Sequence, residues 1–436
     1  MSTATSSGIT AAAFEAFLAA RREPKWLLER RRAAWQLFEE LPMPSRKDEE
    51  WMRTDIRLFH FDRFHLPIET GATGEVQPGL LTEGVKLAGQ TIAVDSWPRS
   101  ARLDPKWVAQ GVLFGSLDEM VSAHGALLQP HLMTKAFSAR YDKFAALHAA
   151  CWSGGMVLYV PKGVVIDQPL HSLTAISPRG VDFSHTLVIL EEGAEATLLS
   201  ETAGGEDAEP SLHCGAIELL LAPEARLRYV NLQNWGKGTW HFAHQKALVD
   251  RDASLQWTIS ALGSRLAKVN QHVALVGPGA STQVNGVIFT EDKQHLCYNT
   301  HQHHVAPHCQ SDLLYKGALQ DHSRLVWRGM IKVDRDAQKT NGYQRNDNLV
   351  LSDTARSDSI PGLEIEADDV RCTHGSTAGR VDDEQIFYAR CRGLTRNEAV
   401  RMIVAGFFQQ VFDRITIESV REALGHAIGR RIREYD

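Results

Sequence analysis

The spacing of hydrophobic residues changes twice along this chain, and the two changes divide it into three regions. From residue 10 to about 60, apolar side chains recur every three or four positions, which is typical of helices. From about residue 153, short apolar runs alternate with turn residues, and from about residue 380 the helical spacing returns. We therefore expect a helical and mixed region at 1–150, a β-rich core at 151–379 and a helical region at 380–436.

Two helices are predicted at the N-terminal end. Phe14, Phe17 and Leu18 share one face of the first helix. Pro24 suits the first turn of the second helix, because a proline at that position loses no hydrogen bond. The prolines of the segment 41–44 end this helix. Residues 61–150 show no dominant pattern.

The middle region repeats one short unit, an apolar run followed by a tight turn that ends in a small or branched residue. Equivalent positions recur about every 27–31 residues, and a further copy at Ala337 lies two steps beyond the fifth. The first five are Val164, Ala194, Ala225, Ala253 and Ala280.

A fixed period made of strands and turns predicts a β-solenoid, because one coil cannot bury its apolar face without its neighbours. A β-sandwich is the alternative, but it does not require this long-range register.

Capping signals predict three helices after residue 380. Residues 382–385 resemble a capping box that opens a helix through Tyr388, and Gly393 closes it. Thr395 and Glu398 form a second capping box, whose helix runs to about Ile415. The last helix carries apolar residues at steps of four, namely Val420, Leu424, Ile428 and Ile432.

The middle helix of this group has two apolar stripes where one core-facing stripe normally suffices. One stripe comprises Ala399, Met402, Ile403, Gly406 and Phe407. The other comprises Val400, Val404, Phe408 and Phe412. Either the helix is fully buried within this chain, or part of it contacts another subunit. On the second reading Met402, Phe407 and Phe408 are the expected partner-binding residues, because large apolar side chains often dominate an interface.

Composition excludes several classes of function. The 436 residues carry a net charge of -6 and no long run of Lys and Arg, so we expect no nucleic-acid partner. No apolar run is long enough to span a membrane. The N-terminus lacks the basic and apolar segments of a secretory signal, which predicts a cytoplasmic protein.

Six cysteines are spread along the chain without a CxxC pair, so we expect reduced thiols and no disulfide framework. The densest group of potential metal ligands comprises His295, Cys297, His301, His303, His304, His308 and Cys309. Neighbouring residues of a strand point to opposite faces, so these side chains should not converge, and a structural or solvent-facing role is expected.

Cys372 and His374 form a second candidate metal site. Residues two apart on an extended segment project to the same side, and thiolate and imidazole are both suitable iron ligands. Two ligands cannot hold a cluster, so the others must come from another chain. The alternative is that Cys372 packs as a small apolar residue and His374 caps a turn. The sequence has no phosphate-binding loop, GxSxG elbow or HExxH motif, so no catalytic role is expected.

At these residues the sequence strongly resembles the SufD family of iron–sulfur cluster assembly proteins. The resemblance is densest in LEIEADDVRCTHGSTAGRVDDEQIFYARCRGL from Leu363 and in AGFFQQVFDRI from Ala405. The segments HVAPHCQSDLLYKGAL, SRLVWRGMIKV, QKTNGYQRNDNLVLSDTA and LPMPSRKDEEWMRTDI fit the same family. Chain length and the Cys-x-His-Gly sequence at Cys372 favour SufD over its paralogue SufB. Asn341, Cys391 and Cys297 depart from the family pattern.

This resemblance implies a right-handed parallel β-helix between helical ends and a scaffold that is not itself an enzyme. It implies a heterodimer with SufB, docking of the ATPase SufC on the C-terminal helices, and a transient iron–sulfur cluster at the SufB interface. Cys372 and His374 match interface residues of the family. The assembled complex of the family can bind reduced flavin, and whether this chain forms a homodimer without SufB is left open. A β-helix enzyme acting on polysaccharide, or a metal enzyme using the histidine-rich stretch, is the alternative function.

Overall fold

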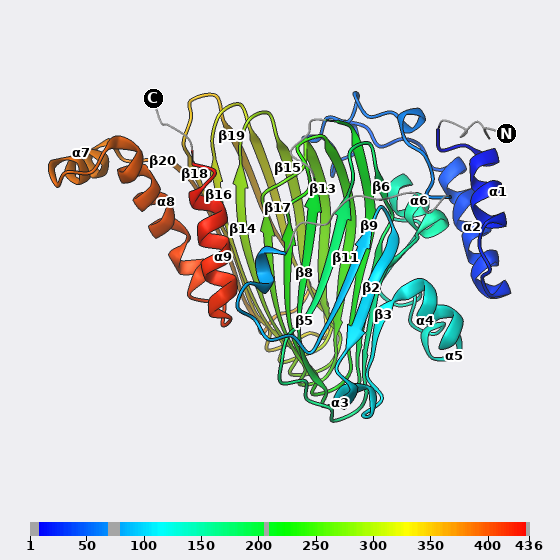
Figure 1. The fold of residues 1–436 in the computed structure, drawn as a ribbon. Helices are drawn as coiled ribbons and strands as arrows, with labels where there is room; N and C mark the ends of the chain where they lie inside the picture. The colour runs from blue at the N-terminus through cyan, green and yellow to red at the C-terminus, as the bar shows by residue number, and fades with distance from the viewer. Residues whose placement is uncertain (1–7, 69–78, 205–208, 433–436) are drawn as a thin grey trace.

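The computed structural model describes residues 8–68, 79–204 and 209–432. Two large β-sheets face one another and run through the centre of the molecule (Figure 1). From β8 onward, consecutive strands belong alternately to the two sheets, and each pairs in parallel with the strand two positions along the chain. This topology is a parallel β-helix flanked by helices, as predicted, and it excludes a sandwich of antiparallel sheets.

We name the two sheets sheet A and sheet B. From β8 onward, each coil of the β-helix contributes one strand to each sheet. In spatial order sheet A comprises β2 (Trp97–Leu103), β1 (Gly89–Val94), β5 (Leu170–Ile176), β8 (Glu195–Gly204), β10 (Arg226–Gln233), β12 (Ser254–Ala261), β14 (Ser281–Thr290), β16 (Gln310–Leu319), β18 (Asn341–Val350) and β20 (Arg371–Arg380). Sheet B comprises β19 (Arg356–Ile365), β17 (Arg324–Val333), β15 (His295–His304), β13 (Leu266–Leu275), β11 (Thr239–Val249), β9 (Ser211–Leu221), β7 (His185–Leu190), β4 (Gly155–Val160) and β3 (Leu113–Ser116), with β6 (Val181–Asp182) paired to β9.

The small residues of the repeat stack from coil to coil. A backbone hydrogen bond connects each repeat position to the next coil. For example, the N–H of Arg226, the residue after Ala225, donates to the carbonyl of Ala194, and the corresponding distances along the β-helix are 2.9 to 3.0 Å. The copies connected in this way are Val164, Ala194, Ala225, Ala253, Ala280, Cys309 and Thr340. Cys309 therefore fills the copy that the alanine pattern did not show. The assignment of Ala337 is corrected, because this turn is longer and Thr340 takes the aligned position.

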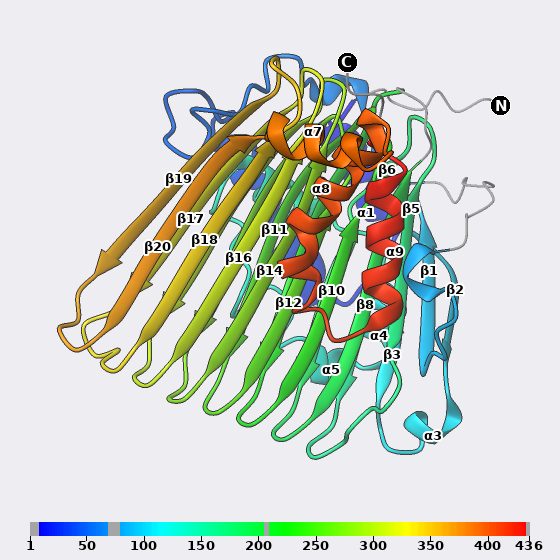
Figure 2. The same cartoon turned by 90° about the vertical axis from the view of Figure 1, so that its left-hand side faces the viewer.

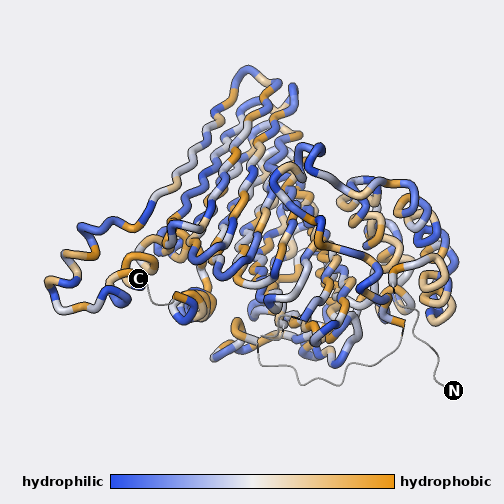
Figure 3. Tube along the Cα trace, turned by 90° about the horizontal axis from the view of Figure 1, so that it is seen from above, coloured by the Kyte–Doolittle hydropathy of each residue, from blue (hydrophilic) through white to orange (hydrophobic). Residues whose placement is uncertain are grey.

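Two groups of helices cover opposite outer faces of the β-helix (Figures 2 and 3). The N-terminal segments α1 (Ala11–Ala19), α2 (Lys25–Glu40) and α6 (Lys143–Cys151) pack on sheet B through an aromatic cluster that includes Phe59, Phe144 and Phe242. The C-terminal helices α7 (Asp383–Cys391), α8 (Arg396–Phe412) and α9 (Glu418–Gly429) follow β20, and α8 and α9 pack on sheet A. The shorter helices are η1 (Phe61–Arg63), η2 (Leu80–Thr82), α3 (Pro105–Val108), α4 (Leu117–Ala123) and α5 (Gly125–Leu128).

The region 61–150, which showed no dominant pattern, contributes three strands to the two sheets. β1 pairs with β2 and also, in parallel, with β5, while β3 pairs antiparallel with β4. These strands close the N-terminal end of the β-helix. Among the helices of the described residues, none combines the length and the apolar character needed to cross a membrane.

Candidate functional site

Cys372 and His374 lie on β20, which is the last strand of sheet A and, among the described strands, pairs with β18 alone. In register, Cys372 is opposite Gly342 and His374 is opposite Gln344. Gly342 and Gln344 belong to the inner face of the sheet, since Gln344 is aligned with the core residue Leu313. Both candidate ligands therefore share one face, as their spacing predicts, and that face is the inner side of the open end of the β-helix.

The two side chains differ in exposure. His374 is exposed, whereas Cys372 is half-buried against the apolar cluster that contains Ile331 and Val333. Burial raises the pKa of the Cys372 thiol. A Cβ atom at position 342 would lie 3.2 Å from the sulfur, so Gly342 leaves the room that this thiol needs. The geometry presents a protonated thiol beside an exposed imidazole, and a metal or a partner cation would favour the thiolate.

No complete metal site surrounds these residues. Across residues 8–68, 79–204 and 209–432, no three His, Cys, Asp or Glu side chains are grouped so that they could hold a metal ion.

The last coil leaves its apolar interior uncovered. Leu363 and Ile365 of β19 continue the inner column formed by Ile331 and Val333, which are fully buried one coil earlier. Their exposed fractions are 37% and 40%. Most residues of β20 are exposed as well, and within the described chain both β19 and β20 have one unpaired edge. Unpaired edges beside exposed apolar side chains are a typical place for another chain to add.

The C-terminal helix α8 divides its two apolar stripes between the core and the surface. Val400, Val404 and Phe408 are fully buried against sheet A and α9. The expectation of a partner-binding side chain at Phe408 is therefore corrected, because this ring belongs to the chain's own core. Met402 is 53% exposed, and Phe407 is partly buried.

Phe407 is held in place by a lysine of sheet A. The Lys316 ammonium lies 4.6 Å from the centre of the Phe407 ring and donates to the Phe407 carbonyl at 3.0 Å. The neighbouring helix α7 carries two further exposed rings, Phe387 at 68% and Tyr388 at 61%. Sequence reasoning missed these two residues, although adjacent aromatic residues on one helix cannot both face a single core.

Comparison with known proteins agrees with this architecture. Residues 173–407 match the family model described as SUF system FeS cluster assembly, SufBD core domain, and residues 15–171 match the SufBD protein N-terminal region. The chain belongs to the SufBD family of iron–sulfur cluster assembly proteins. The core match includes the whole open end of the β-helix with Cys372 and His374.

Several curated relatives carry the same description, "Iron-sulfur cluster assembly SufBD family protein". Those of Staphylococcus epidermidis, Staphylococcus saprophyticus and Staphylococcus aureus are each 26% identical to this chain over 414 residues, which cover 91% of this chain and 88% of the relative. The similarity therefore extends over both helical ends as well as the β-helix.

In this SufBD protein the histidine-rich stretch of β15 is split between the two faces of sheet B. His295, Cys297, His301 and His303 point outward, because they align with outward-facing residues of β13 and β17. His304 points inward and bonds the Ser311 hydroxyl at 2.8 Å. His308 and Cys309 lie in the following turn. The alternation expected for a strand is therefore observed.

Proposed function

We propose that this chain is the SufD-type scaffold subunit of a SUF complex, and that its open β-helix end forms part of the place where a nascent cluster is assembled. The observation that carries the proposal is the common orientation of Cys372 and His374 on an edge strand whose outer edge has no partner in the described chain. A thiol and an imidazole there supply two ligands of the kind that iron–sulfur clusters accept. Chain length and the Cys-x-His-Gly sequence support SufD rather than SufB.

Pairing with SufB would complete this end of the molecule. Another parallel β-helix has strands of the same kind, so it can pair with the edge of β19 or β20 and cover Leu363 and Ile365. A partner seated there would also bring its own ligands next to Cys372 and His374. The transient cluster is cargo shared between two chains, and the scaffold catalyses no reaction of its own.

The ATPase SufC is proposed to bind the exposed faces of α7 and α8. Met402 and the partly buried Phe407 offer an apolar surface on α8, and Phe387 and Tyr388 extend it onto α7. Helix α7 begins at Asp383, shortly after β20 ends at Arg380, so a movement of α7 can be transmitted directly to the strand that carries Cys372. Binding of reduced flavin by the complete complex remains part of the proposal without an assigned site.

Co-purification with both partners tests this assignment. Leu363→Asp with Ile365→Asp is expected to abolish SufB binding and retain SufC, since it places charge in the apolar end of the β-helix. Phe387→Asp with Met402→Asp is expected to abolish SufC binding and retain SufB, since it places charge on the exposed surface of α7 and α8. Val276→Asp is a matched control, because Val276 is 40% exposed on a turn away from both surfaces. Retention of both partners by both double variants would refute the assignment.

A further inference from the structure

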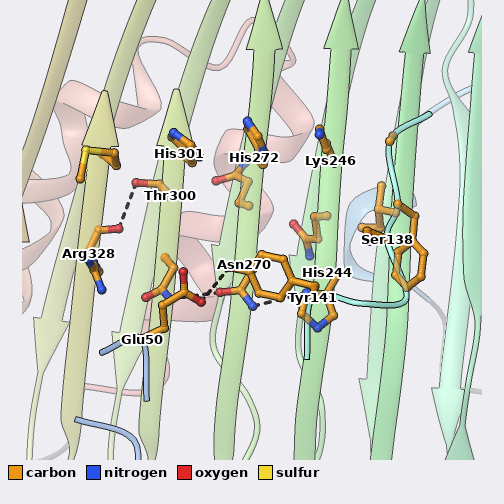
Figure 4. Close-up of a pocket in the computed structure, with 17 residues that line it drawn as sticks. Glu50, Ser138, Tyr141, His244, Lys246, Asn270, His272, Thr300, His301 and Arg328 are labelled. Atoms are coloured by element: carbon orange, nitrogen blue, oxygen red, sulfur yellow. Dashed lines mark hydrogen bonds between the residues drawn. The ribbon is translucent and has the colours of Figure 1, made fainter. Parts of the chain in front are cut away.

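A cavity of about 260 Å³ lies between the outer face of sheet B and the N-terminal region (Figure 4). We call it the sheet B cavity. Strands β11, β13, β15 and β17 form one wall, and residues 136–138, Tyr141 and Glu50 form the other. It faces away from the helices on sheet A and from β20, so neither partner surface proposed above includes it.

Two rows of aligned side chains, most of which carry nitrogen, cross the strand wall. Lys246, His272, His301 and Met330 occupy aligned positions on the four strands. The row two residues earlier contains His244, Asn270, Asn299 and Arg328. Figure 4 shows Lys246, His272 and His301 side by side on adjacent strands.

The first row has unused hydrogen-bonding capacity. The Nε2 atoms of His272 and His301 are buried and have no hydrogen-bond partner. Their rings are stacked with centres 4.4 Å apart. Within the part of the chain that the structure describes, the Lys246 ammonium forms no hydrogen bond or salt bridge. Buried polar groups are normally paired, so the two neighbouring imidazole nitrogens require an explanation.

The acidic groups nearby have partners of their own. Glu50 accepts from the Tyr141 hydroxyl at 2.7 Å, and Asp142 pairs with His244 at 3.1 Å. Three more carboxylates are engaged by Arg328, His303 and Lys332, namely Glu49, Asp334 and Glu364. Glu218 is buried under the loop, where it accepts from two backbone N–H groups and pairs with His185. Glu218 also aligns with Lys246 across β9 and β11, where its charge partly offsets the lowering of the Lys246 pKa by burial. Among the described residues, however, no carboxylate forms a hydrogen bond or salt bridge with Lys246, His272 or His301.

The electrostatics of the row favour an anion. Burial and the neighbouring His301 and Lys246 lower the pKa of His272 to about 2. Burial and His303 lower the pKa of His301 to about 4. Both imidazoles are therefore neutral near pH 7, and Lys246 carries the positive charge of the row. Each neutral imidazole can donate one N–H group to a bound anion.

The remaining walls are suited to an apolar group. Phe137 and Met330 line the cavity with Tyr141, whose ring lies 4.9 Å from that of His244. The volume of about 260 Å³ lies just below the range for drug-sized ligands, which begins at about 300 Å³, so the cavity suits a smaller molecule. We propose that the sheet B cavity binds a small organic anion, with its carboxylate or phosphate group against Lys246, His272 and His301 and its apolar body against Phe137 and Met330.

Calorimetric titration of the full chain with phenyl phosphate, benzoate, inorganic phosphate and neutral benzyl alcohol tests the proposal. An aromatic anion should bind at one site, and should bind more tightly than inorganic phosphate or benzyl alcohol. If phenyl phosphate binds more tightly than benzoate, the cavity prefers a phosphate group, and the reverse order indicates a carboxylate. Lys246→Gln and His301→Gln should each weaken binding about tenfold or more, because each removes a charge-assisted hydrogen bond.

The same strands supply matched controls. Lys332→Gln and His303→Gln remove the same side-chain types from sheet B, but from residues already paired with Glu364 and Asp334. They should change the affinity less than about twofold. Binding should also shift the Cε1–H resonances of His272 and His301 in carbon-labelled protein. The proposal is wrong if no anion gives saturable binding, if benzyl alcohol binds as tightly, or if all four variants behave alike.

Discussion

Single residues decide which of the expected contacts are available to partners. Phe407 and Phe408 are adjacent on α8 and chemically identical, yet Phe408 is fully buried and Phe407 is only partly buried. The sequence shows two stripes but cannot show which one sheet A covers, because the covering residues come from strands some hundred positions earlier. The position of Cys372 was easier to predict, since the alternation of a strand depends on local geometry alone.

Because α8 has one buried and one exposed apolar stripe, replacing a side chain of each stripe by alanine should affect stability differently. Phe408→Ala should lower the free energy of unfolding by about 3–5 kcal/mol, because it leaves a cavity in the core. Met402→Ala should change it by less than about 0.5 kcal/mol, because the side chain is mainly in solvent. Urea unfolding of the full chain measures both values. Equal losses for the two variants would contradict the assignment of the buried stripe.

At the scale of elements, capping was predictable from sequence because it depends on residues within one turn. Thr395 and Glu398 form the expected reciprocal capping box at the start of α8. Strand pairing across long separations was predictable only where the repeat was regular. Cys309 was missed because a thiol replaced the small alanine, and β1 was missed because its parallel partner β5 is distant in sequence and its own segment carries no repeat.

The capping box yields a test of α8 itself. Thr395→Ala should destabilise the chain by about 1 kcal/mol, because the Glu398 backbone N–H loses its acceptor. Thr416→Ala is the control, since Thr416 is exposed and lies outside the helices. Thermal or urea unfolding compares the two. Equal stability of both variants and the unmodified chain would show that this cap contributes little.

The strands of sheet B predict a pH dependence. Burial lowers the pKa of His241 to about 3, and burial lowers those of His301 and His304 to about 4 with His303 as a further cause. Below a pH of about 6.5 the unfolded chain takes up protons at these residues while the folded chain does not, so stability falls as pH decreases toward 4. Asp182 acts in the opposite sense, because burial raises its pKa to about 6.

The combined effect of His241, His301 and His304 on stability is larger than the opposite effect of Asp182. The free energy of unfolding should therefore rise from pH 5 to pH 7. Each histidine contributes on the order of 1 kcal/mol. Urea unfolding at the two pH values measures the change, and His304→Gln should reduce it. A lower stability at pH 7 than at pH 5 would contradict the neutral state assigned to these side chains.

At the scale of the whole molecule, the β-helix is closed at one end and open at the other. The N-terminal strands β1 to β3 and the helices on sheet B cover the first coils, whereas β19 and β20 extend beyond the C-terminal helices (Figure 2). Because the open end and the C-terminal helices are separate surfaces, a second β-helix could bind the last coil while a third protein binds the helices.

Hydrogen exchange tests the proposal that SufB binds the open end of the β-helix. In the isolated chain, amides at the free edges of β19 and β20 should exchange rapidly, because they have no strand partner beyond them. Addition of SufB should slow exchange in these two strands and leave β11 and β13 unchanged. Protection confined to other coils would place the partner elsewhere.

The central claim is that Cys372 and His374 contribute to a cluster shared with SufB. Its most direct test is anaerobic reconstitution of the complex with His374→Ala, Cys372→Ala and double-variant chains, scored as iron and sulfide per complex. Ser376→Ala is the matched control, because Ser376 is the next residue on the same face of β20. We predict normal folding and binding of both partners in every variant, a loss of cluster that is larger for His374→Ala than for Cys372→Ala, and no loss for Ser376→Ala. Full cluster yield in both single variants and the double variant would contradict the account.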